Sequence, residues 1–123
     1  SEPGVAFRYG GASMQLAGRM AEIASGKDWN SLFREKIAAP LGLEKTRFAD
    51  QNPRVAGGAV STLDEFGAFV LMIRNNGMHQ GRQVLSPKAV ALQRQDQTRG
   101  ARIEETPYRS FGPLHPVMPA MRY

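Results

Sequence analysis

The chain has 123 residues, enough for one domain, and its 41% hydrophobic and 22% charged residues are typical of a globular protein. It contains no cysteine, which excludes disulfides and thiolate metal sites. The net charge of +5 is compatible with a nucleic-acid partner, but the basic residues are scattered without a stripe of stacking aromatics, so we expect no nucleic-acid binding.

Helical periodicity and stop signals predict two helices in the first third of the chain. The first covers residues 12–25 and ends at Gly26. Its apolar stripe consists of Leu16, Met20 and Ile23. Asp28 is a typical N-cap for the second helix, which Pro40 and Gly42 end. Residues expected in the core of the protein are Trp29, Met14, Met20 and Met72.

A third helix is expected to begin after Thr62. Thr62 and Glu65 stand three residues apart, which predicts a capping box, and the sequence Asn-Asn-Gly at 75–77 ends the helix. The apolar positions predicted to be buried on it are Leu63, Phe66, Val70 and Ile73.

The pattern weakens towards the C-terminus. Residues 81–85 favour a short extended piece, and Ser86 as N-cap with Pro87 in the first turn predicts a fourth, weaker helix. After Thr98 the periodicity is lost, and four prolines favour an extended, irregular segment over residues 99–123. The sequence thus predicts a helical region over 1–98 and a proline-rich tail over 99–123.

The order of three phrases carries more information than any single one. The phrases "PGVAFRYGGASMQLAGRMAEIASGKDWNSLFREKIAAPLGLEKTRF", "AGGAVSTLDEFGAFVLMIRNNG" and "GRQVLSPKAV" follow one another within residues 3–98. This series resembles the serine β-lactamase-related family, which includes class C β-lactamases, penicillin-binding-protein-like peptidases and many carboxylesterases. The resemblance implies an α/β sandwich with a helical subdomain. This chain would supply mostly the helical part, so the expected fold class is mainly α with minor β.

The resemblance also implies three catalytic elements: a Ser-x-x-Lys helix, a Tyr-x-Asn loop, and a Lys-Thr-Gly or His-Thr-Gly strand. Tyr9, Gly10 and Gly11 fall on the Tyr-x-Asn positions. Tyr9 would then be the catalytic acid–base group that shuttles the proton of the serine, and its alternative role is to pack at a strand-to-helix corner. Such a phenol needs a neighbouring ammonium to act as a base near neutral pH.

Gly11 stands where the family has asparagine, which makes it the candidate substrate-binding position. The missing amide would hydrogen-bond an acylamide substrate, so its absence favours esters over β-lactams or peptides. Alternatively, the paired glycines let a substrate or backbone approach closely.

The other two elements are not found. No serine is followed three residues later by lysine, and Lys45-Thr46 precedes Arg47 rather than glycine. We therefore expect an internal fragment of a serine hydrolase that acts through an acyl-enzyme, is more esterase-like than β-lactamase-like, and is inactive alone. The alternative is a non-catalytic interaction or regulatory module that keeps the helical scaffold.

The remaining candidates favour structural roles. His79 and His115 have no second ligand at metal-binding spacing, and Ser61-Thr62 is better explained by helix capping than by a nucleophile. We expect no metal, no cofactor and no membrane span, and the compartment is not indicated. The expected partners are a small-molecule ester or acyl substrate of the parent protein, and a second copy or complementary chain that covers exposed apolar faces.

Overall fold

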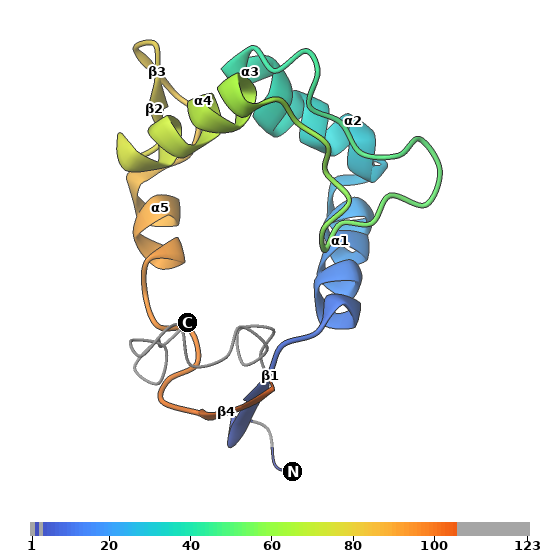
Figure 1. Ribbon diagram of the computed structural model, residues 1–123, viewed down its shortest axis with the longest axis vertical. Helices are drawn as coiled ribbons and strands as arrows, with labels where there is room; N and C mark the ends of the chain where they lie inside the picture. The colour runs from blue at the N-terminus through green and yellow to red at the C-terminus, as the bar shows by residue number, and fades with distance from the viewer. Residues whose placement is uncertain (1, 3, 106–123) are drawn as a thin grey trace. The chain divides into compact units, whose positions relative to one another are not determined.

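The computed structural model describes residues 2 and 4–105 (Figure 1). They divide into a small unit, which consists of residues 2, 4–10 and 94–105, and a larger unit, Gly11–Gln93. The described residues form helices with a few short strands, which confirms the expected class of mainly α with minor β. The expected boundary at residue 98 stays a prediction.

The small unit is held together by two parallel strands. Strand β1, Ala6–Arg8, pairs with β4, Arg102–Glu105, and Ala6 is opposite Arg102 in the register. The side chain of Arg8 donates to Glu104 over 2.9 Å. This bond, and a second one from Arg102, lower the pKa of the Glu104 carboxyl. The predicted tail therefore contains a paired strand, and its residues 106–123 lie outside the described part of the chain.

The first helix of the larger unit, α1, spans Gly11–Ser25 and stops at Gly26, whose φ of 69° is left-handed. One side of α1 packs against the loop that contains Pro53 and Val55. The amide of Gln15 donates to the carbonyl of Pro53 over 2.8 Å and accepts from the backbone N–H of Val55 over 2.9 Å. Gly18, the buried residue of α1, lies so close to Val55 that an added Cβ would come within 2.7 Å of it.

A continuous helical run follows α1 and is made of three segments. These are α2, Trp29–Phe33, then η1, Arg34–Ala38, a π-helical turn, and then α3, Ala39–Leu41. Asp28 caps the run as predicted and accepts from the backbone N–H of Ser31 over 3.0 Å.

Pro40 does not end this run, contrary to the sequence-based expectation. Proline cannot donate to the carbonyl four residues back and its ring crowds that carbonyl, so the preceding turn widens. Accordingly, the N–H of Ala39 bonds to the carbonyl of Arg34, five residues back. The run ends at Gly42, which has a φ of 68°.

The core of the larger unit lies between this helical run and α4, Leu63–Arg74. The fully or nearly buried side chains in it are Ala38, Leu41, Leu43 and Met72. A second contact ties the start of the run to the following loop, because Phe48 packs edge-on against both Trp29 and Phe33 at ring-centre distances of 5.5 and 5.2 Å.

Helix α4 begins as predicted, because the hydroxyl of Thr62 accepts from the N–H of Glu65. The other half of the capping box is replaced by a longer-range contact. The carboxylate of Glu65 accepts from three consecutive backbone N–H groups, those of Glu44, Lys45 and Thr46, at 2.9, 2.9 and 2.7 Å. This carboxylate therefore ties the first turn of α4 to the loop after α3.

The predicted buried face of α4 is wrong. Leu63, Phe66 and Val70 are 85%, 57% and 46% exposed, whereas Met72 is fully buried. Of the four positions expected to be buried, Ile73 does pack on the core. The helix is apolar on most sides, so its periodicity alone could not show which side meets the core.

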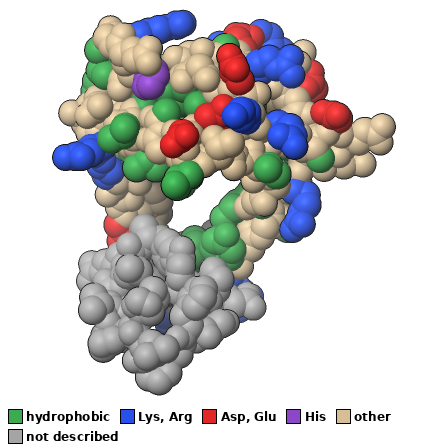
Figure 2. All heavy atoms as spheres, turned by 45° about the horizontal axis from the view of Figure 1, so that its top comes forward, with side chains coloured by type: hydrophobic (Ala, Val, Ile, Leu, Met, Phe, Trp, Pro, Cys, Tyr) green, Lys and Arg blue, Asp and Glu red, His purple; other side chains and the backbone are tan. Residues whose placement is uncertain are grey.

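On helix α1, too, the residues predicted to form the apolar core face are exposed. Leu16, Met20 and Ile23 are 62%, 62% and 70% exposed, and Met14 is also exposed, so neither Met14 nor Met20 belongs to the core. The covered side of α1 is instead the side of Gln15 and Gly18. Figure 2 shows hydrophobic side chains at the surface between charged ones on the described part of the molecule.

The end of the larger unit is a hairpin and a short helix. Strands β2, Met78–His79, and β3, Arg82–Gln83, pair antiparallel, and α5 spans Pro87–Gln93. The hydroxyl of Ser86 accepts from the N–H of Ala89 over 3.1 Å, as expected of its N-cap. No helix within residues 2 and 4–105 combines the length and the apolar character that crossing a membrane requires.

Candidate functional site

The predicted Tyr-x-Asn positions follow β1 directly. Tyr9 is 40% exposed, and within the described residues its phenol makes no hydrogen bond. Tyr9 is therefore partly accessible in the described part of the chain, which both the acid–base role and the packing role at the corner allow. Gly11 is the first residue of α1.

The two glycines of this corner are not required by the backbone. Neither Gly10 nor Gly11 has a left-handed φ, and an added Cβ at Gly10 would meet nothing within 4 Å. At Gly11 an added Cβ would lie 3.6 Å from the Cβ of Ala56, an ordinary van der Waals contact. A side chain fits at position 11, so the absence of the family's asparagine is a chemical difference rather than a steric necessity.

Several serine hydroxyls of the larger unit make structural hydrogen bonds. Ser31 donates to the carboxylate of Asp28 over 2.6 Å at the N-cap of α2, and Ser86 caps α5. Ser61 hydrogen-bonds the hydroxyl of Thr46 over 2.7 Å and the carbonyl of Thr62 over 3.1 Å. None of these contacts pairs a serine with a lysine or histidine that could act as its base.

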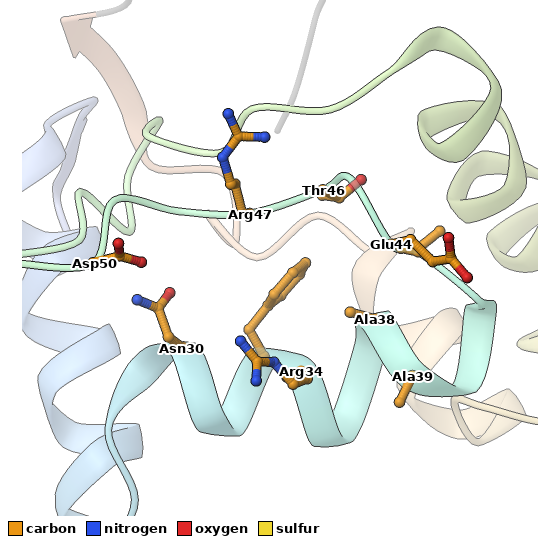
Figure 3. Close-up of a pocket in the computed structure, with 10 residues that line it drawn as sticks. Asn30, Arg34, Ala38, Ala39, Glu44, Thr46, Arg47 and Asp50 are labelled. Atoms are coloured by element: carbon orange, nitrogen blue, oxygen red, sulfur yellow. The ribbon is translucent and has the colours of Figure 1, made fainter.

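A hollow that no sequence pattern indicated lies beside the helical run (Figure 3). It has a volume of about 470 Å³, and its apolar lining residues include Phe33, Ala38 and Leu43. Asn30 and Arg34 line it from the helical run, and Arg47 and Asp50 line it from the following loop, as Figure 3 shows. Among the described residues that line it there is neither a serine nor a histidine.

The histidines and acidic residues form no metal site in the part of the chain that the structure describes. His79 lies in the β2–β3 hairpin, and the predicted position of His115 is outside the described residues.

Comparison with known proteins shows which family the chain belongs to. The family model described as Beta-lactamase matches residues 1–117. The chain belongs to the β-lactamase family. This membership confirms the resemblance drawn from the ordered phrases.

Two solved structures have the same fold as this member of the β-lactamase family. A protein from Bacteroides dorei assigned as a β-lactamase is 42% identical, with a TM-score of 0.80 over 88% of this chain and 34% of its own. A β-lactamase from Mycobacterium bovis is 24% identical, with a TM-score of 0.70 over 82% of this chain and 35% of its own. The chain thus spans about a third of the length of each. None of the curated proteins compared with it matches.

The residues that sequence reasoning missed are those of the Glu65 contact. Three consecutive backbone N–H groups surround the carboxylate of Glu65, and the hydroxyl of Thr46 donates to it as well. These bonds, the one from Thr46 foremost, lower the pKa of the Glu65 carboxyl. The contact joins residues about twenty positions apart, so no local spacing indicated it. It positions the loop that lines the hollow.

Proposed function

We propose that this chain is part of a serine hydrolase that acts through an acyl-enzyme, with Tyr9 as the acid–base group. The observation that carries the proposal is the accessible phenol of Tyr9, which follows β1 at the family's Tyr-x-Asn position and makes no hydrogen bond within the described residues. The nucleophilic serine, its lysine and the Lys/His-Thr-Gly strand are supplied by polypeptide outside this chain. An ammonium from that polypeptide stabilises the phenolate.

The substrate is an ester rather than a β-lactam or a peptide. The argument is the glycine at position 11, where a side chain has room but no amide is present. An acylamide substrate gains more than an ester from a side-chain amide, because its own N–H and carbonyl need partners when they leave water.

A hybrid protein tests both statements. In it, this chain replaces the matching stretch of the Bacteroides dorei protein, and hydrolysis of a nitrophenyl ester and of a chromogenic cephalosporin is measured. We expect the isolated chain to give background rates and the hybrid to favour the ester. Gly11→Asn should shift the ratio of kcat/KM values towards the cephalosporin, and Gly10→Asn is the matched control.

Two outcomes would contradict the proposal. A folded hybrid that hydrolyses neither substrate would favour a non-catalytic module. An unchanged substrate ratio in Gly11→Asn would remove the argument for esters and leave the acyl-enzyme mechanism standing.

A further inference from the structure

The hollow beside the helical run is formed by one stretch of chain, residues 30–50, within the larger unit. Its volume of about 470 Å³ lies in the range of small-molecule sites, which is about 300–1,000 Å³. Among its apolar lining residues, Ala38 and Leu43 are buried and Phe33 is partly buried. The hollow therefore has the size and the apolar surface that a small organic ligand needs.

The loop that forms one wall of the hollow is held at three points. The carboxylate of Glu65 binds the backbone at its start. In its middle, Arg47 and Val60 exchange two backbone hydrogen bonds of 2.9 and 2.8 Å. Towards its end, the side-chain amide of Asn30 donates to the carbonyl of Ala49 over 3.0 Å. Because this wall is already ordered, a ligand that binds to it pays little conformational entropy.

The helical wall of the hollow contains an uncommon turn. Arg34 begins the π-helical turn η1 and Ala38 ends it, and both line the hollow. Such turns are rare and frequently lie at functional sites. Within the described residues the guanidinium of Arg34 makes no hydrogen bond or ion pair, whereas Arg8 and Arg19 each pair with a glutamate. The donors of Arg34 are therefore available to a ligand in this part of the chain.

The charged side chains of the hollow alternate in sign along it. In Figure 3, Arg34 and Arg47 lie on the two walls, between the ends. Asp50 lies towards one end and Glu44 towards the other. A guanidinium binds a carboxylate through two parallel hydrogen bonds, whereas acidic groups at both ends repel an extended polyanion. The arrangement therefore fits a ligand with one singly charged anionic group.

We propose that the hollow is a binding site for a small amphipathic carboxylate. Its anionic group is held by Arg34 and Arg47. Its apolar body lies against Phe33 and Leu43. This binding does not involve Tyr9, so it does not rest on the proposed hydrolase mechanism. Because charged groups are costly to remove from water, we expect this charged hollow to stay open in longer members of the family as well.

NMR titrations with 4-phenylbutyrate test the proposal, in the isolated chain and in the hybrid. The uncharged 4-phenylbutanamide tests the need for a carboxylate, and phenyl phosphate tests whether a dianion is preferred. Arg34→Gln and Arg47→Gln each remove one cation of the hollow. Arg82→Gln is the matched control, because Arg82 is exposed on β3 and does not line the hollow.

The expected Kd for 4-phenylbutyrate is about 1 mM or tighter, with shifts of the backbone amide signals of Arg34 and Arg47. Because charge-assisted hydrogen bonds are the stronger ones, Arg34→Gln or Arg47→Gln should raise the Kd about tenfold. The change to 4-phenylbutanamide should weaken binding by a similar factor, and Arg82→Gln should leave the Kd unchanged. The hybrid should give the same Kd.

Four results would overturn the proposal. Equal Kd values for the carboxylate and the amide in the wild type would show, without any variant, that the cations do not hold the ligand. Tighter binding of phenyl phosphate would contradict the ligand class. Signal shifts confined to α1 and α4 would assign the probe to exposed apolar side chains. Binding that is lost in the hybrid would show that the rest of the fold covers the hollow.

Discussion

Alanine substitutions along α4 should reveal which side of the helix stabilises the chain. Met72 is fully buried, so Met72→Ala removes apolar contacts and leaves a cavity, which costs about 2–5 kcal/mol. Phe66 is 57% exposed and so has less than half of its surface covered. Because full burial of such a side chain is worth about 1.5–3 kcal/mol, Phe66→Ala should cost about 1 kcal/mol. Leu63 is 85% exposed, so Leu63→Ala should lower the free energy of unfolding by only about 0.3 kcal/mol.

The free energy of unfolding of each variant is measured by urea denaturation. The fluorescence of Trp29, the single tryptophan of the chain, reports the transition, because its ring packs against Phe48. The expected order of losses is Met72, then Phe66, then Leu63. A loss at Leu63 or Phe66 as large as that at Met72 would refute the assigned core face and restore the face inferred from the sequence.

Three other predictions use the same assay. Gly77→Ala should destabilise the chain by about 2 kcal/mol or more, because Gly77 has a φ of 85° and an added Cβ would lie 1.9 Å from the carbonyl oxygen of Leu85. Gly67→Ala, in the middle of α4 with open space around it, should stabilise by up to about 1 kcal/mol, and equal effects at both glycines would contradict this reasoning. The lowered pKa of Glu65, caused first by the hydroxyl of Thr46, makes its contribution to stability present above about pH 4.5 and lost as the pH falls below that value. The urea midpoint of the wild type should therefore fall more steeply on acidification than that of Glu65→Gln, and parallel curves would show that this contact adds no pH dependence.

The helix ends could be predicted from the sequence because they depend on neighbouring residues. The side chains of Asp28, Thr62 and Ser86 cap helices within three residues of their own positions. Gly26 and Gly42 stop helices because they adopt a left-handed φ. Each of these contacts is local, so the spacing of residue types was sufficient to find it.

The sides of the helices could not be predicted, because they depend on distant contacts. Glu65 looked like half of a capping box, yet its carboxylate binds a backbone segment about twenty residues away. The stripe from Leu16 to Ile23 has the spacing of a core face, but the chain covers the opposite side of α1 instead. The position of Tyr9 was inferred from the order of family phrases, and its catalytic role stays a prediction.

The measurement that tests the central claim most directly is the effect of Tyr9→Phe on the hybrid protein. The substitution keeps the ring and its contacts but removes the oxygen that would carry the proton. If Tyr9 is the acid–base group, kcat/KM for the ester should fall by about a hundredfold or more, while the melting temperature barely changes. Unchanged turnover in Tyr9→Phe, together with a loss of stability in Tyr9→Ala, would show that Tyr9 only packs at the corner after β1.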